Sequence, residues 1–354
     1  MHIYEYLLTA VMIMAILLSS ISMVEMISEP ARNVLEKEEL KVAVQKLMTQ
    51  VLLDPGNPPD WGSNFTADSL KTFGLAKYSE TTRDVYVLDP DKVLRLNDAL
   101  LQLEVTSQLY IPPSRMRDLL NLGREYGLAL QLSPALTVTI NKISDLDRYE
   151  VDVASEFGVL PIFGANVTAR MFYYDASTSL VSSTGMTVNR TTYNGKCIVD
   201  FGNLNSVAKI LVLVAEYYGE YVVKVMPIGL GLCQAYLLGD RLFMNETCSV
   251  PSNEVYEVIV TKKAGRYIIE SVKSSISKVE DGVFQLDYVE PTVVAVLTAL
   301  GGPIHLTFAS LEANVTYNLS SGQWSFPYAY SVERTVTIGG SFYVMTLYVW
   351  RTSW

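Results

Sequence analysis

The segment from Tyr6 to Val24 (YLLTAVMIMAILLSSISMV) contains nineteen residues and no charged side chain. As an α-helix that rises about 1.5 Å per residue, it extends about 28 Å, close to the hydrocarbon thickness of a bilayer. A cleaved secretory signal is the alternative. Such signals begin with a basic stretch and end at a small-residue cleavage site, and neither is evident here. We therefore predict a retained transmembrane helix within residues 1–27.

A second helical pattern follows the apolar segment. The sequence Ser28-Glu29-Pro30 places a capping residue before a proline, which is typical of the first turn of a new helix, so we predict a kink or break there. Over residues 28–54 the apolar side chains recur with the helical period and predict an amphipathic stalk. They are Val34, Leu35, Leu40, Val44, Leu47, Met48 and Val51. Residues 55–65 are rich in proline and glycine and predict a stiff linker anchored by Trp61.

Two signals bear on which side of the membrane the body lies. Arg32, Lys37 and Lys41 follow the apolar segment, and basic residues favour the cytoplasmic side. Six N-x-S/T glycosylation acceptors point the other way, because roughly two are expected by chance. They begin at Asn64, Asn166, Asn189, Asn245, Asn314 and Asn318. We therefore predict a glycosylated body outside the cell.

The body has the composition of a folded β-rich protein. A chain of 354 residues is expected to form two or three units. Residues 66–155 predict a small α+β domain, with one helix from Asp89-Pro90 to Leu103 and another from Pro112-Pro113 to Gly123. Short alternating strands then predict an immunoglobulin-like β-sandwich over residues 156–230 and a β-rich C-terminal domain over residues 231–354. The run Val293–Leu300 suits a helix or a buried strand equally.

The cysteines suggest one bridge. Cys233 to Leu238 and Arg241 to Cys248 read as the strands of a hairpin around a Gly239-Asp240 turn. In an exported protein a disulfide between Cys233 and Cys248 can close such a hairpin and stabilise it by about 3 kcal/mol. Cys197 reads as a small buried apolar residue.

Catalytic chemistry has little support in this sequence. Only two histidines occur, His2 and His305, and neither belongs to a pattern that supplies a nucleophile with its base. Gly229-x-Gly231 lacks the third glycine of a dinucleotide-binding loop. The formal charge of −10 disfavours nucleic-acid binding, which needs clustered basic residues. We expect no catalytic residue, no cofactor and no nucleic-acid partner.

Two groups of carboxylates are candidates for calcium or acid-catalysis sites. The first is Asp145, Asp147 and Asp152 in the stretch DLDRYEVD, and the second is Glu280 and Asp281 in a predicted turn. Neither matches the spacing of an EF-hand loop, so solvated turn charges are the favoured interpretation.

Glu5 precedes the apolar segment directly, and an acid at that place needs a partner in a membrane. The pattern Met1-His2-Ile3-Tyr4-Glu5, continued by the apolar helix and the stalk, resembles the mature N-terminus of type IV pilins and archaeal pilin-like proteins. The stretches LLDPGNPPDWGS, FGLAK and YVWRTSW look like those of large archaeal pilin-like membrane proteins. In that family the acid pairs with the N-terminal amine of a neighbouring subunit. The resemblance implies that Met1 supplies the amine, Glu5 the acid, and that the helices bundle into a filament core.

These observations predict an N-terminal transmembrane and amphipathic α-helix followed by α+β and mainly-β extracellular domains. The expected function is that of a non-enzymatic pilin-like subunit or membrane-anchored cell-surface protein. Its partners are the membrane and copies of itself or other pilin-like subunits. The alternative is a singly anchored adhesin or lectin-like protein that binds a surface ligand through exposed tyrosines. The candidates are Tyr173, Tyr174, Tyr217 and Tyr218.

Overall fold

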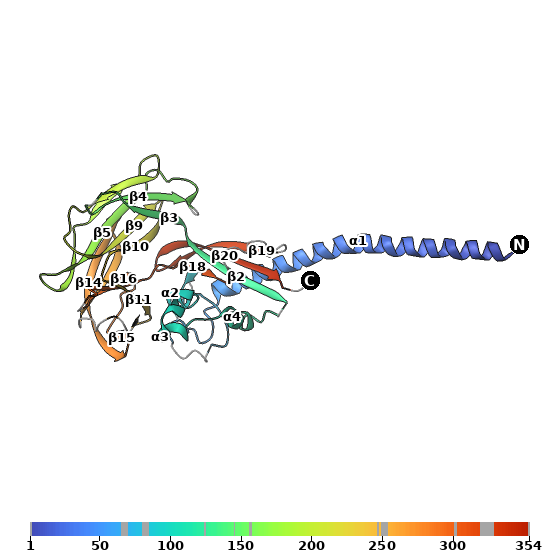
Figure 1. Ribbon diagram of the computed structural model, residues 1–354, viewed down its shortest axis with the longest axis horizontal. Helices are drawn as coiled ribbons and strands as arrows, with labels where there is room; N and C mark the ends of the chain where they lie inside the picture. Colours follow the sequence, from blue (N-terminus) through green and yellow to red (C-terminus); the bar gives the residue numbers. More distant parts are fainter. Residues whose placement is uncertain are drawn as a thin grey trace.

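The computed structural model shows one long helix that projects from a β-rich body (Figure 1). It describes residues 2–64, 70–79, 85–123, 125–144, 146–155, 158–245, 248, 254–300, 303–318 and 329–352. Within these ranges the side chains of residues 2, 3, 5–7, 21–36, 104 and 105 are outside the description. The prediction of a helix followed by a mainly-β body is confirmed.

Helix α1 runs from His2 to Leu53 without interruption. The break that we predicted at Ser28-Glu29-Pro30 is therefore wrong. A proline removes only one amide donor, so the turns on either side keep their own hydrogen bonds. Near the body the helix buries Leu40, Val44 and Val51, which follow the predicted amphipathic period.

The end of α1 packs on a five-stranded sheet in the order β1-β19-β20-β2-β18. Its strands are β1 (Val87–Leu88), β2 (Tyr126–Pro134), β18 (Val315–Tyr317), β19 (Ala329–Ile338) and β20 (Ser341–Arg351). We call this sheet, with α1 and the segments that cover it, the base. The last strand of the chain pairs with β2 over nine residues, so sequence-distant segments share one core.

Short helices follow β1 along the chain, and they pack partly on the base core and partly against a second core. They are α2 (Pro90–Leu94), the 3₁₀ helix η2 (Asp98–Gln102), α3 (Glu104–Ser107) and α4 (Pro113–Leu119). The single helix predicted from residue 90 to Leu103 is wrong because Asn97 caps a new helix, accepting a hydrogen bond from the Ala99 amide. The helix expected to reach Gly123 ends at Leu119.

Trp61 anchors the proline-rich segment, as predicted. Trp61 is buried, and its indole Nε1 donates to the carbonyls of Pro55 and Gly74 at 3.1 and 3.0 Å. Its ring lies beside Phe73 and under the Arg95 guanidinium. The proline-rich segment is therefore part of the base core.

A two-sheet sandwich follows the base. One sheet has the order β3-β4-β8 and the other β10-β9-β5-β6, with β7 paired to β5. The strands are β3 (Leu136–Lys142), β4 (Arg148–Ser155), β5 (Asn166–Asp175), β6 (Leu180–Ser183), β7 (Thr187–Arg190), β8 (Lys196–Asp200), β9 (Ala208–Tyr217) and β10 (Glu220–Gly229). Side chains of both sheets, among them Val151, Met171 and Leu213, form one core between them.

Seven strands close into a barrel in the order β11-β12-β15-β14-β13-β16-β17. They are β11 (Leu232–Leu238), β12 (Arg241–Met244), β13 (Glu254–Lys263), β14 (Arg266–Glu280), β15 (Val283–Leu286), β16 (Val293–Ala299) and β17 (Leu306–Ser310). The apolar run that begins at Val293 is thus a buried strand.

The β5–β9–β10 sheet lies between two other layers. In β9, Ile210 and Val212 face the barrel core, whereas Leu211 and Leu213 face the sandwich core. This double burial explains why the strand is apolar almost throughout, since a strand covered on both faces has no solvent side.

Strand pairing crosses the predicted domain boundaries. From the segment 66–155, β2 joins the C-terminal sheet of the base, and β3 and β4 join β8 of the sandwich. The described body therefore consists of the base, the sandwich and the barrel, and each of these contains at least one pair of strands from distant parts of the chain.

Candidate functional site

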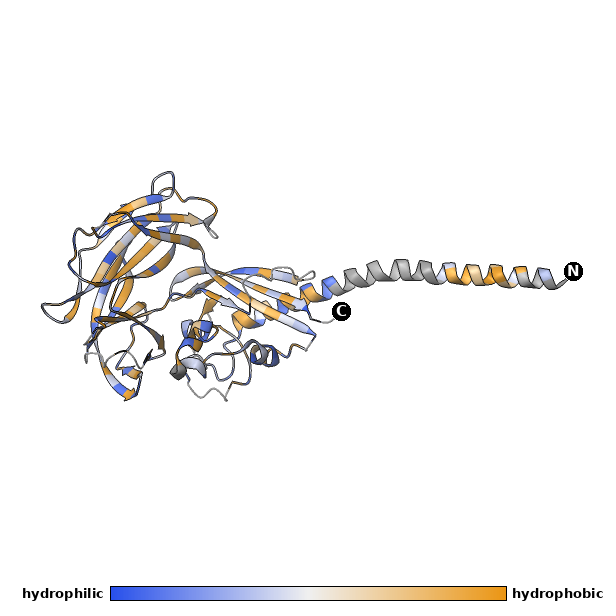
Figure 2. Cartoon of the chain, in the orientation of Figure 1, coloured by the Kyte–Doolittle hydropathy of each residue, from blue (hydrophilic) through white to orange (hydrophobic). Residues whose placement is uncertain are grey.

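The distal part of α1 exposes apolar side chains on every side. All thirteen residues from 8 to 20 are exposed, and Figure 2 shows this hydrophobic stretch standing clear of the body. Leu8, Met14 and Ile16 are each exposed by about two thirds (65%, 64% and 64%). A helix that is apolar all round is normally covered by lipid or by other helices. This segment is the strongest candidate site for binding or assembly.

The proximal part of the same helix is fixed to the body. Leu40, Val44, Met48 and Leu52 belong to the base core with the strands β19 and β20. The exposed apolar segment and the buried end of the helix thus belong to one continuous helix, which is fixed to the body at its C-terminal end.

None of the helices, as far as the structure describes them, has the length and apolar character needed to cross a membrane. Of the predicted span from Tyr6 to Val24, the side chains are described from Leu8 to Ser20.

The predicted assembly pair lies outside this description. Met1 is not among the described residues, and the side chain of Glu5 is not described, although its backbone is helical. Their pairing stays a prediction.

The interpretation of the first carboxylate group as solvated turn charges is wrong for Asp147, because this side chain is buried among structural partners. Asp147 is buried, and its Oδ2 lies 2.6 Å from Nζ of Lys209 and accepts from the Leu204 amide at 3.0 Å. The Tyr149 hydroxyl donates to its Oδ1 at 3.2 Å. Lys209 belongs to the opposite sheet, so this ion pair ties the two sheets of the sandwich together.

Two of the remaining acids also lie beside a lysine, and Glu280 is exposed. Asp152 lies 3.4 Å from Lys196, and Asp281 lies 2.6 Å from Lys278. Asp145 lies outside the described residues. Within the described part of the chain, no three His, Cys, Asp or Glu side chains are grouped to hold a metal ion.

The cysteines form one bridge and one buried thiol. A disulfide joins Cys233 to Cys248, with a Cα–Cα distance of 6.6 Å. The paired residues Leu238 and Arg241 flank the expected two-residue turn. Cys197 is buried, and burial together with the nearby Asp152 raises the pKa of its thiol to about 11. A thiol with so high a pKa is a poor nucleophile at neutral pH.

The glycosylation acceptors differ in access. Asn189, Asn245, Asn314 and Asn318 are exposed, whereas Asn64 and Asn166 are half-buried. The amide of Asn166 donates to Glu216 at 2.9 Å, and that of Asn318 donates to the Leu128 carbonyl at 2.6 Å. Nδ2 of Asn189 likewise donates to the Ile198 carbonyl. A glycan at any of these three has to displace a contact within the fold, although Asn189 and Asn318 are exposed.

Of the four tyrosines proposed for ligand binding, one is fully available. Tyr218 is 90% exposed at the turn between β9 and β10, and its ring meets that of Tyr217 edge-on at 4.5 Å. Tyr217, Tyr173 and Tyr174 are half-buried. Tyr174 stacks on His305 at 5.0 Å, which gives that histidine a structural contact.

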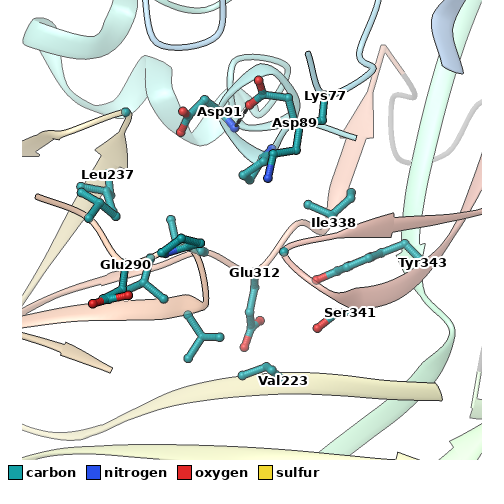
Figure 3. Close-up of a pocket in the computed structure, with 18 residues that line it drawn as sticks. Lys77, Asp89, Asp91, Val223, Leu237, Glu290, Glu312, Ile338, Ser341 and Tyr343 are labelled. Carbon is teal, nitrogen blue, oxygen red and sulfur yellow. Dashed lines mark hydrogen bonds between the residues drawn. The ribbon is translucent and has the colours of Figure 1, made fainter. Parts of the chain in front are cut away.

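A cavity of about 260 Å³ lies where the base, the sandwich and the barrel meet (Figure 3). Carboxylates of Asp89, Asp91, Glu290 and Glu312 line it. Glu312 is paired with Lys224 at 2.9 Å and accepts from the backbone amide of Val225. These contacts make the cavity a joint between the three units, and sequence reasoning did not identify it.

Asp91 is the electrostatically unusual group at this joint. Burial, reinforced by the neighbouring Asp89, raises the pKa of Asp91 to about 6, although a hydrogen bond with the Gly239 backbone opposes the shift. At pH 7 or above this carboxyl is ionised, although its surroundings in the folded protein favour the neutral form.

We expect Asp91→Asn to stabilise the protein above pH 7. Because the pKa of Asp91 is higher when folded, its protonated form favours folding, and that contribution is lost as the pH rises through about 6. The amide keeps an oxygen acceptor, so the gain is about 1–3 kcal/mol at pH 8 and vanishes below about pH 4. Urea unfolding across this pH range measures it. The exposed Asp118→Asn serves as the control, and a gain at Asp91 that does not depend on pH would contradict the explanation.

No protein family matches the chain, and no curated protein matches it. One solved structure with partial similarity is native alpha-2-macroglobulin from Escherichia coli spanning domains NIE-MG1. It shares 11% sequence identity, and the similarity covers 51% of this chain and 97% of that chain with a TM-score of 0.18. A score this low carries no argument about fold or function.

Proposed function

We propose that this protein is a non-enzymatic, pilin-like surface protein that assembles or anchors through its N-terminal helix and presents its β-rich body outside the cell. The observation that carries the proposal is the uncovered apolar segment of α1, residues 8–20, held by a helix whose other end is buried in the body. An isolated apolar helix exposed to water is unfavourable, because each fully buried large apolar side chain contributes about 1.5–3 kcal/mol. Lipid or neighbouring helices supply that burial.

The partners in this proposal follow from the same segment. They are the membrane and other copies of the chain or of pilin-like subunits, with Met1 and Glu5 as the interacting pair. Ala10, Ala15 and Ser19 are the small residues that allow helices to approach each other closely. The disulfide between Cys233 and Cys248 is in keeping with an oxidising compartment.

A singly anchored adhesin is the second candidate. The exposed Tyr218 favours it, since a fully accessible aromatic ring is a common contact residue. The two candidates differ in whether the helix packs against copies of itself.

Electron microscopy of cell-surface preparations separates them. We expect the wild type to form filaments that an antibody to the body labels along their length, and Glu5→Ala to abolish them because the N-terminal amine loses its acid partner. Glu39→Ala, at an exposed position on the same helix, is the control and should leave filaments intact. Diffuse membrane label in the wild type and in both variants would favour the singly anchored protein.

A further inference from the structure

A polar groove of about 570 Å³ lies between the sandwich and the barrel. The sandwich wall carries Asn166, Asn189, Arg190 and Glu216, and the barrel wall is the turn between β13 and β14, with Arg266 after it. The volume is within the range of pockets that hold small molecules.

The turn of the barrel hairpin places Arg266 at this groove. Lys263 and Arg266 are paired, so Ala264 and Gly265 form a two-residue turn. Both have positive φ, 50° and 77°, as a type I′ hairpin turn requires. No heavy atom lies within 4 Å of a Cβ built on Gly265, so the turn stands free over the groove.

Most charges around the groove are paired with one another. Lys262 lies 3.6 Å from Glu216, and Lys263 lies 3.0 Å from Glu270. Neither Arg190 nor Arg266 forms an ion pair with any residue that the structure describes. Two uncompensated guanidinium groups therefore face one groove in a protein whose formal charge is −10.

One of the two guanidinium groups is already oriented. Nε of Arg190 donates to Oδ1 of Asn166 at 3.2 Å, and Nδ2 of Asn166 donates to Glu216 at 2.9 Å. This chain of contacts holds the Arg190 head group by its Nε, while no hydrogen bond from its terminal nitrogens to a described residue is present. A planar guanidinium with open terminal nitrogens matches a carboxylate in a two-point contact.

We propose that this groove binds a short saccharide that carries carboxylates, with Arg190 and Arg266 as the groups that hold them. The Nδ2 groups of Asn166 and Asn189 already donate to Glu216 and to the Ile198 carbonyl, so these side chains offer a hydroxyl-rich ligand their carbonyl oxygens. The two guanidinium groups attract an anion. A long polyanion is disfavoured by the net negative charge of the whole protein. Asn189 is also a glycosylation acceptor, so a glycan attached there competes with the ligand for the groove.

This inference goes beyond the proposed function, because the groove lies in the body and needs no assembled helix. A failure of ligand binding leaves filament formation untouched, and loss of filaments in the Glu5 variant leaves binding untouched.

The full chain is produced in a host without N-glycosylation and kept in detergent. Its binding of digalacturonate, the probe, is then measured by calorimetric titration. We expect binding that weakens as salt is raised, since exposed charges are screened. Arg190→Gln and Arg266→Gln should each weaken binding about tenfold or more, and the double variant should abolish it. Arg334→Gln, at an exposed position in β19 outside the groove, should bind like the wild type.

Three results would overturn the proposal. They are no binding of digalacturonate to the wild type, equal binding of an uncharged disaccharide of the same size, and undiminished binding by the double variant. Circular dichroism of each variant verifies that the body is folded, because both arginines are exposed and their replacement leaves no buried group unpaired.

Discussion

Replacing Met14 with arginine is expected to remove most of the protein from the membrane and from any filament. Met14 is 64% exposed near the middle of the apolar segment, and a charge at the centre of a membrane helix costs about 2.5–3.5 kcal/mol. The segment Tyr6–Val24 contains nine Leu, Ile and Val residues, which together favour membrane insertion by about 3–5 kcal/mol. The serine and threonine side chains of the same segment reduce this free energy. One arginine therefore cancels most of the driving force, equivalent to about a hundredfold change in partitioning.

The matched control is Val42→Arg. Val42 is 47% exposed on the same helix, in the part fixed to the base, so its replacement adds the same charge without touching the apolar segment. Membrane fractionation and filament yield measure both variants, and thermal unfolding shows whether the body is intact. If Met14→Arg partitions and assembles like Val42→Arg, the apolar segment is not the anchoring site.

The second large effect is expected at the ion pair inside the sandwich. Lys209→Met leaves the Asp147 carboxylate buried without its cation, and breaking a buried pair in this way costs about 3–5 kcal/mol. The side chains of Lys209 and Asp147 are only 11% and 3% exposed, so water cannot replace the lost partner. Equilibrium unfolding in urea, monitored by tryptophan fluorescence, measures the loss of unfolding free energy.

Two further variants test this explanation. Adding Asp147→Asn to Lys209→Met removes the stranded charge and keeps an acceptor for the Leu204 amide, so most of the stability should return. Lys263→Met breaks the ion pair with Glu270, in which the two side chains are 57% and 41% exposed. This variant should lose less than about 1 kcal/mol of unfolding free energy. Equal losses in the two single lysine variants would contradict the assignment of a buried pair.

Local elements were predictable because their signals are local. The Gly239-Asp240 turn predicted the hairpin between β11 and β12. The apolar period of the stalk identified Leu40, Val44 and Val51, which the base buries. Each of these patterns is complete within about twenty residues, so no knowledge of the rest of the chain was needed.

Long-range pairing was not predictable in this way. Strand β2 pairs with β20, and β11 pairs in parallel with β17. The sequences of these strands contain no signal that identifies the partner strand. Period and turn chemistry set which face of a strand is buried, but partner choice depends on the packing of the whole body. Predicted boundaries drawn along the chain therefore do not follow the strand pairing.

The candidate sites show the same division. The apolar helix was identified from composition alone, whereas the acids around Asp147 gave no sign that one of them faces a lysine on another sheet. A signal was nevertheless present, because Lys209 is the only charge in the apolar run from Ala208 to Ala215. A lone cation in a strand buried on both faces needs an anionic partner. The groove and the joint depend on segments far apart in sequence and have no local signature.

The docking of α1 on β19 and β20 has a consequence for biogenesis. Helix α1 is synthesised long before β19 and β20, so it can dock on these two strands only after they emerge. At ordinary translation rates the interval is on the order of tens of seconds. During that time Leu40, Val44 and Met48 lack the part of their native surface that β19 and β20 supply. Apolar side chains that stay uncovered during synthesis favour aggregation, so the interval before β19 and β20 are made is the stage at which this chain is most exposed to it.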